Sequence, residues 1–90
     1  MPLASCTRST SGGVKATPGM LEGVVLTAGS DAATVIVYDN ASEASGTVLC
    51  KLAALANTST SAVFPDPIVA SKGLYVTVTG TNPSASLYYL

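Results

Sequence analysis

The sequence predicts an all-β domain: a small β-sandwich, jelly-roll or Greek-key like, of about seven short strands. Two observations lead to this prediction. Seven short runs rich in Val, Ile, Thr and Tyr, which strands prefer, occur at near-regular intervals. Turn-forming residues such as Gly, Pro, Asn and Asp separate the runs, a spacing typical of sandwiches and barrels. The length of 90 residues allows one domain at most.

The first segment, residues 1–13, is small and polar and ends in two glycines. This composition predicts a flexible N-terminal arm, so that residues 14–90 form the sandwich domain. The first three strands are expected in the runs "GVKATPG", "MLEGVVLTA" and "ATVIVYD". The segments Thr17-Pro18-Gly19 and Gly29-Ser30-Asp31 provide the turns between them.

The fourth run, "TVLCKLAAL", is open to two interpretations. As a strand, it places Val48, Cys50, Leu52 and Ala54 on one face and Lys51 on the other. As a helix, it gathers Leu49, Leu52, Ala53 and Ala56 on one side. We expect a strand, because the run is short and lacks a strong helix cap, although short apolar runs are ambiguous by pattern.

The last three runs also read as strands. "SAVFPDPIVA" contains Pro65 and Pro67, which confine a strand to a sheet edge or a bend. "LYVTVTG" alternates cleanly, with Leu74, Val76 and Val78 pointing one way. "SASLYYL" is apolar and is expected to be docked, because an open apolar strand is an aggregation edge.

The low charge of the chain bears on its partners. Charged residues make up 10% of the sequence, with four Lys or Arg against five Asp or Glu, where about 25% is usual. A domain of this size leaves much of its surface exposed. We therefore expect part of that surface to be covered by further copies or by a larger partner; the alternative is a monomer kept soluble by its Ser and Thr hydroxyls.

Other partners and compartments are less compatible with this composition. The balance of charges and the lack of a basic patch argue against nucleic acid. The apolar runs are too short to cross a bilayer, so no membrane partner is expected. The N-terminal residues do not read as a secretory leader, and we expect synthesis in the cytoplasm.

The sequence offers little catalytic chemistry. It contains no His and no phosphate-binding glycine motif, so we expect no enzyme and no cofactor. Cys6 and Cys50 lack the spacing of a metal site or a disulfide framework. The loop "DNASEASG" carries oxygen ligands suited to Ca²⁺, at Asp39, Asn40, Ser42 and Glu43. Its spacing favours an ordinary Asx turn closed by Gly46, and ion binding by the Asp39–Glu43 loop stays open.

The tyrosines suggest an interaction surface. Four of them form either a sugar-stacking platform or part of a protein interface, and their enrichment at protein contacts favours an interface. The residues expected at an oligomer or capsid interface are Leu3, Arg8, Tyr75, Leu87, Tyr88, Tyr89 and Leu90.

The segment from Thr17 to Tyr89 resembles small β-sandwich virion proteins of tailed bacteriophages, of the capsid decoration or cement type. "TPGMLEGVVLTAGSDAATVIVYDNASEASGTVLCKL" and "FPDPIVASKGLYVTVTGTNPSASLYY" carry the resemblance, in that order. The "YDNASEASGT" turn and the "KGLYVTVTGT" strand are its most distinctive parts. The resemblance implies a compact sandwich, often trimeric, and brings no catalytic residues with it.

The expected function is therefore structural. The chain is expected to bind the assembled phage head as a homotrimer, with the major capsid protein as its partner, and to stabilise the virion surface by mass action. The arm of residues 1–13 is expected to lie across a neighbour. The alternative is a tail, neck or fibre-associated β-domain that binds a host-surface glycan or another virion protein.

Overall fold

The computed structural model describes residues 4–90, which fold into eight strands and no helix. The strands are β1 (Ala4–Arg8), β2 (Gly12–Lys15), β3 (Gly19–Thr27), β4 (Ala33–Asp39), β5 (Thr47–Ala54), β6 (Ser59–Ala70), β7 (Leu74–Thr79) and β8 (Ser84–Tyr89). The all-β sandwich prediction is confirmed, and all seven predicted runs contain a strand. The fourth run, "TVLCKLAAL", forms β5 rather than a helix. Within the described range, no helix is long and apolar enough to cross a membrane.

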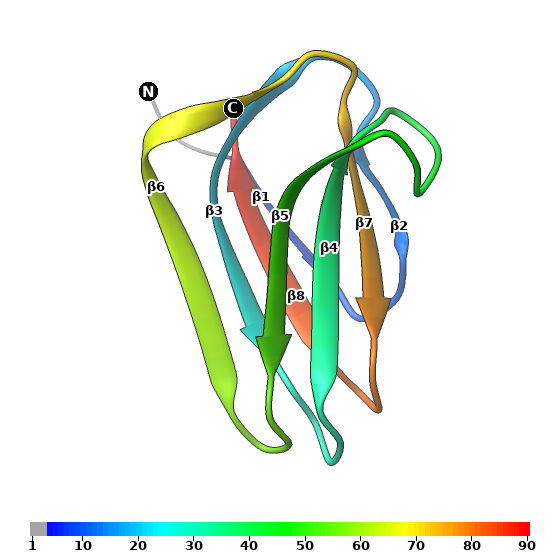
Figure 1. The fold of residues 1–90 in the computed structure, drawn as a ribbon, viewed down its shortest axis with the longest axis vertical. Coiled ribbons are helices and arrows are strands. Elements are labelled where there is room, and N and C mark those ends of the chain that lie inside the picture. The colour runs from blue at the N-terminus through cyan, green and yellow to red at the C-terminus, as the bar shows by residue number, and fades with distance from the viewer. Residues whose placement is uncertain (1–3) are drawn as a thin grey trace.

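The strands form two four-stranded sheets that pack face to face. One sheet has the order β1-β8-β3-β6 and is called sheet A here; sheet B has the order β2-β7-β4-β5. In Figure 1, β4, β5 and β7 of sheet B lie in front of β3 and β8 of sheet A. The antiparallel pairs β1–β8, β2–β7, β3–β6 and β4–β5 are those of one long hairpin rolled into two layers. This connectivity is the jelly roll, one of the two alternatives left open by the strand pattern.

The N-terminal segment requires a correction. Residues 4–8 pair with β8 from Ala4↔Tyr89 to Arg8↔Ala85, and Gly12 and Gly13 pair with β7. The described part of the expected arm is therefore built into both sheets, whereas residues 1–3 lie outside the described residues. The short polar strand β1 shows no apolar alternation in the sequence. Its strand conformation depends instead on backbone pairing with β8. The Arg8 guanidinium also donates to the carbonyl oxygens of Thr10 and Gly13, each at 3.2 Å, which fixes the link to β2.

The core lies between the sheets and consists of small and medium aliphatic side chains. β7 alternates as predicted, with Leu74, Val76 and Val78 buried. The largest fully buried side chains are Leu21, Leu26, Leu74, Leu87, Val24, Val35, Val37 and Val76. No polar or charged residue of the described range is buried there. Burial of these side chains, at about 1.5–3 kcal/mol each, is the main stabilising contribution to the fold.

A β-bulge in β5 overturns part of the predicted alternation. Val37 pairs with Cys50, but Tyr38 pairs with Val48, so Leu49 is an extra residue on β5. The bulge shifts the side-chain phase. Cys50 lies against the core as expected, whereas Val48 faces solvent and is 51% exposed. Val48 therefore belongs to the outer face of sheet B, not to the face that we predicted.

A larger irregularity interrupts β6, the edge strand of sheet A. Leu21 pairs with Ile68 and Gly23 with Val63, so residues 64–67 of β6 stand opposite Glu22 alone. These four residues are the "FPDP" segment, whose prolines predicted an edge or a bend. Phe64 packs against the core from this bulge. The interruption splits the pairing of β6 with β3 into two short ladders.

Candidate interaction surface

The outer face of sheet A carries most of the exposed apolar side chains. Of seven large apolar residues exposed in the described range, five lie on β3, β6 and β8 or directly after β8: Met20, Val63, Val69, Tyr88 and Leu90. Val63 and Val69 are 78% and 64% exposed. We call these five residues the apolar cluster. A contiguous exposed apolar surface of this kind marks an interaction site more often than single exposed residues do.

The strand register makes the apolar cluster contiguous. Met20 pairs with Val69 on one side, and on the other side it exchanges backbone hydrogen bonds of 3.0 and 2.9 Å with Leu90. Gly23 pairs with Val63 on one side and with Tyr88 on the other. The cluster thus forms two adjacent rows across three strands that are far apart in the sequence.

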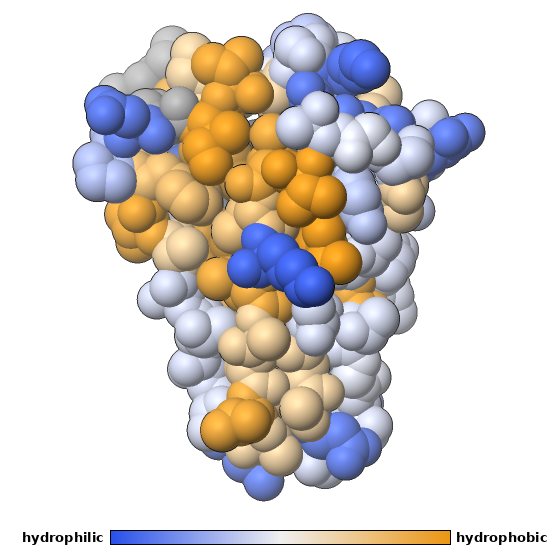
Figure 2. Space-filling view, in the orientation of Figure 1, coloured by the Kyte–Doolittle hydropathy of each residue, from blue (hydrophilic) through white to orange (hydrophobic). Residues whose placement is uncertain are grey.

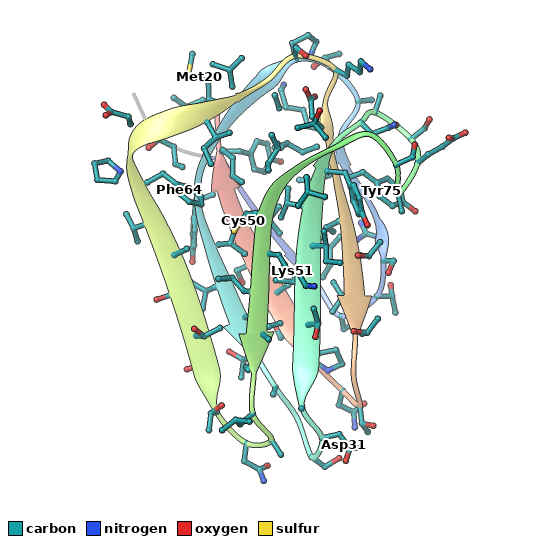
Figure 3. The ribbon with its side chains drawn as sticks, viewed as in Figure 1. Met20, Asp31, Cys50, Lys51, Phe64 and Tyr75 are labelled. Atoms are coloured by element: carbon teal, nitrogen blue, oxygen red, sulfur yellow. The ribbon has the colours of Figure 1, made fainter. Side chains whose placement is uncertain are left out.

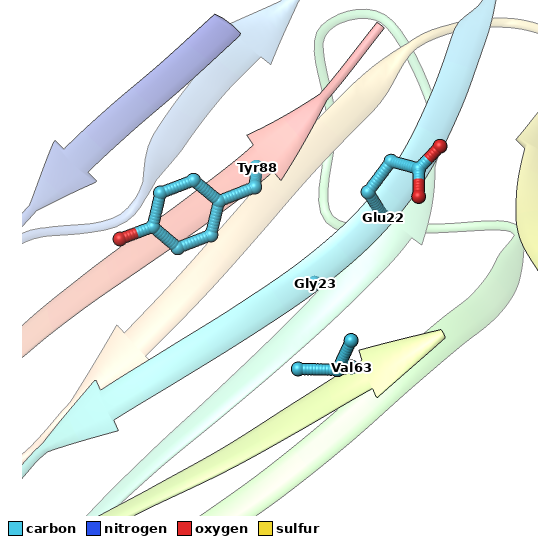
Figure 4. A pocket seen from close by; sticks show the side chains of 4 residues that line it. All are labelled: Glu22, Gly23, Val63 and Tyr88. Carbon is cyan, nitrogen blue, oxygen red and sulfur yellow. The ribbon is translucent and has the colours of Figure 1, made fainter. Parts of the chain in front are cut away.

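A hollow lies between Tyr88 and Val63. Gly23 has no side chain at the centre of the second row, and the resulting cavity of about 260 Å³ is lined by Glu22, Gly23, Val63 and Tyr88. Figure 4 shows the Tyr88 ring and Val63 on the two sides of Gly23, and Glu22 from the same strand as Gly23. A Cβ atom at Gly23 would lie 3.2 Å from the Ala62 carbonyl oxygen and 3.9 Å from the Tyr88 ring. Because Gly23 has no side chain, its backbone forms the floor of the hollow.

The other end of the same face is polar. Its outward residues are six hydroxyl side chains of β1, β3, β6 and β8 around one valine: Thr7, Val25, Thr27, Ser59, Ser61, Ser84 and Ser86. Thr7 and Ser86 share a hydrogen bond of 2.9 Å between their hydroxyl oxygens. The outer face of sheet A is thus divided into an apolar half and a hydroxyl half, with Glu22 beside the apolar half.

The outer face of sheet B has a different character. Ile36 pairs with Lys51, and Tyr38 pairs with Val48 and with Tyr75. Figure 2 shows hydrophobic residues around one hydrophilic residue at the centre of this face, and Figure 3 places Lys51 there, on the outside of the sheet. Cys50, the next residue, points inward, and burial raises the pKa of its thiol. Lys51 therefore extends from an apolar surround into solvent.

The acidic loop has the geometry of a turn. The Asn40 side-chain oxygen accepts hydrogen bonds from the backbone amides of Ser42 and Glu43, each at 2.9 Å, and Gly46 has a φ of 91°. Asp39 belongs to a different contact. Its carboxylate accepts hydrogen bonds from the Lys72 amide at 2.8 Å and from the Ser71 hydroxyl at 2.9 Å. These bonds, the one from Lys72 first, lower the pKa of Asp39.

Asn40 thus forms the expected Asx turn, whereas Asp39 accepts hydrogen bonds from the distant Ser71–Lys72 turn. Within the described residues, no group of three or more His, Cys, Asp or Glu side chains is arranged to hold a metal ion.

The residues expected at the interface lie in different parts of the structure. Tyr88 and Leu90 belong to the apolar cluster, while Tyr75 lies half-buried on the outer face of sheet B. Tyr89 packs against the core, and Arg8 binds backbone carbonyl oxygens.

Leu87 is fully buried and belongs to the core, so its placement at an interface was wrong. The alternation of β8 explains this result, because Leu87 and Tyr88 must point to opposite faces. Leu3 lies outside the described residues.

Sequence reasoning missed most of the surface. Met20, Val63 and Val69 were read only as strand residues, and Glu22 and Lys51 were given no role. One signal was present: a glycine inside a strand often marks a close approach or a gap in a sheet face, and Gly23 is such a residue. Its partners Val63 and Tyr88 could not be inferred, because they depend on the register of β6 and β8.

No family model, no curated protein and no solved structure matches this chain. The functional proposal therefore depends on the residues and surfaces described above.

Proposed function

We propose that this protein is a structural component of a bacteriophage virion, a capsid decoration or cement protein that binds the assembled head as a homo-oligomer and stabilises it. The observation that carries the proposal is the apolar cluster on the outer face of sheet A. The resemblance of residues 17–89 to small virion proteins supplies the class of partner. The jelly roll is compatible with it but does not decide it, since viral capsid and lectin domains both use this fold.

The apolar cluster has a thermodynamic role in this proposal. Its five side chains lie in water in the isolated chain, and covering them on a partner is favourable by about 25 cal/mol for each Å² of apolar surface removed from water. A protein that binds only the assembled shell stabilises that shell by mass action. Many copies on a symmetric lattice add avidity to each weak contact. No catalytic group is needed for this work.

The direct test is binding to purified phage heads that lack the protein. We expect the wild-type chain to sediment with the heads and to raise their temperature of disruption. Val63→Glu should abolish sedimentation, because it places a charge in the apolar cluster. Ser61→Glu is the matched control, since Ser61 is exposed on the same strand and face but in the hydroxyl half. Equal binding by the two variants, or no binding by the wild type, would contradict the proposal.

A second candidate function is favoured by the hollow at Gly23. An aromatic ring beside a carboxylate, as with Tyr88 and Glu22, is a combination that also suits a sugar. In this case the chain is a tail, neck or fibre-associated domain that binds a host-surface glycan. A glycan array probed with the labelled protein distinguishes the two candidates: specific binding that is lost in Tyr88→Ala favours the second.

A further inference from the structure

We propose that Lys51 of one copy of this chain docks into the Gly23 hollow of a second copy, between Tyr88 and Val63 and against the Glu22 carboxylate. This inference rests on the self-association in the proposed function and deepens it by naming the contact. Lys51 is exposed on the outer face of sheet B, and the hollow opens on the outer face of sheet A.

The hollow has the chemistry to hold a lysine side chain. Its floor is the backbone of Gly23 and its walls are the Val63 side chain and the Tyr88 ring, which suit an alkyl stem. Glu22 stands beside the hollow and is half-buried, so its carboxylate can receive an ammonium group in a partly dehydrated site. The tyrosine ring adds a favourable contact with the cation.

The surroundings of Lys51 also favour docking. Ile36 is its cross-strand partner, and the Val48–Tyr38 pair is the next outward-facing pair along the ladder. In Figure 2 the charged side chain rises from a hydrophobic area. Docking would bring this area onto the apolar cluster of the second copy, so that apolar surface is covered on both sides. The ion pair is then shielded from water, where it is stronger than an exposed pair.

The distribution of charge favours contact between unlike faces. The strands β3, β6 and β8 carry Glu22 and Asp66 but no Lys or Arg. If two copies met through the same face of sheet A, these carboxylates would approach each other with no cation from these strands to balance them. Contact between sheet A of one copy and sheet B of the next pairs Glu22 with Lys51 instead.

The proposed contact joins two different surfaces, and each joined pair still presents one free Lys51 and one free hollow. Because the two faces lie on opposite sides of the sandwich, as Figure 1 shows, copies stack head to tail. A heterologous contact between opposite faces extends as an open column.

Charge reversal tests the contact. The self-association of Lys51→Glu and of Glu22→Lys is measured separately by light scattering over a range of concentrations, and then in an equimolar mixture. We expect each variant alone to associate at least about tenfold more weakly than the wild type. The mixture should recover most of the loss, because every sheet A to sheet B contact between unlike variants again pairs opposite charges.

Two matched variants control for net charge. Lys72→Glu and Glu43→Lys change the charge in the same way at exposed turn and loop positions outside both surfaces. They should associate like the wild type, alone and mixed. Glu22→Gln is used in parallel in case the reversed charge in the bulged strand prevents folding, which circular dichroism detects. It should also weaken association.

The outcomes separate this inference from the proposed function. Wild-type association that is insensitive to charge reversal, or a mixture that does not recover, overturns the Lys51 contact and leaves head binding through the apolar cluster standing. A wild-type chain that stays monomeric at every concentration overturns the contact together with self-association in solution. Loss in both single variants and recovery in the mixture supports the contact.

Discussion

Neighbouring residues of a strand face opposite sides of its sheet and have different roles, as Leu87 and Tyr88 of β8 show most clearly. Leu87 is fully buried between the sheets, whereas Tyr88 is exposed on the outer face of sheet A beside the hollow. The side-chain period of two in a strand imposes this difference. A substitution at one position therefore tests stability, and the same substitution at the next position tests association.

We expect Leu87→Ala to lower the free energy of unfolding by about 2–5 kcal/mol, because it leaves a cavity in the core. Tyr88→Ala should cost about 1 kcal/mol or less, since its side chain is partly exposed. Urea unfolding at a concentration where the chain is monomeric gives both values. Tyr88→Ala should instead weaken head binding. An equal loss of stability in the two variants would contradict their assignment to opposite faces.

Asp39 makes stability depend on pH at the residue scale. Its pKa is lowered from the ordinary value of 3.8, chiefly by the Lys72 amide. The folded state therefore favours the ionised form, and this stabilisation is present above pH 3.8 and is lost as the pH falls through the lower, folded pKa.

The difference in unfolding free energy between the wild type and Asp39→Asn should thus narrow as the pH falls below 3.8. Thermal or urea unfolding from pH 7 to pH 2 measures it. Glu43→Gln, which removes an exposed carboxylate from the same loop, controls for the loss of one negative charge. A constant difference between the wild type and Asp39→Asn across this range would show that the Lys72 and Ser71 bonds do not favour the charged form.

At the scale of elements, β1 completes the roll. It covers one side of β8, whose other side pairs with β3, so that β8 is an interior strand of sheet A. Without β1, the run "SASLYY" becomes an open edge, and exposed apolar edges promote aggregation. The N-terminal strand β1 therefore has a structural role that cannot be predicted from its polar sequence.

Removal of residues 1–8 should lower the free energy of unfolding by about 2 kcal/mol or more, since each lost ladder hydrogen bond contributes about 1 kcal/mol net. The shortened chain should also aggregate, which turbidity during heating detects. Thr7→Ala is the control: it removes the hydroxyl bond to Ser86 but keeps the backbone pairing, and it should cost less than about 1 kcal/mol. A shortened chain as stable as the wild type would refute this role of β1.

The elements also show what the sequence could and could not predict. The alternation of "LYVTVTG" predicted β7 and its buried face, and the prolines of "FPDP" predicted an edge strand. Val48 was placed on the wrong face, because a one-residue bulge at Leu49 cannot be seen in a pattern of apolar letters. β1 was missed because its strand conformation depends on a partner about 80 residues away.

The candidate surface was harder to predict than the fold for the same physical reason. Tyr88 and Leu90 were recognised from their residue types. The hollow, in contrast, exists only because the register places Gly23 between Val63 and Tyr88, and that register follows from the bulge at Glu22. Side-chain chemistry is visible in a sequence, whereas the neighbours that turn it into a surface are not.

The molecule as a whole combines low charge, a closed jelly roll and an exposed apolar cluster. A chain with 10% charged residues has little charge with which to keep two apolar outer faces apart in solution. The faces are unlike, one with Glu22 beside a hollow and the other with a protruding Lys51. We therefore propose that the sandwich is a rigid support for two contact surfaces.

The most direct test of this central claim is the solution mass of the purified chain, measured by light scattering on a sizing column at several concentrations, with and without a chelator. We predict a mass of several subunits that rises with concentration, is unchanged by the chelator and falls towards one subunit in Val63→Glu. A wild-type mass of one subunit at every concentration would contradict it.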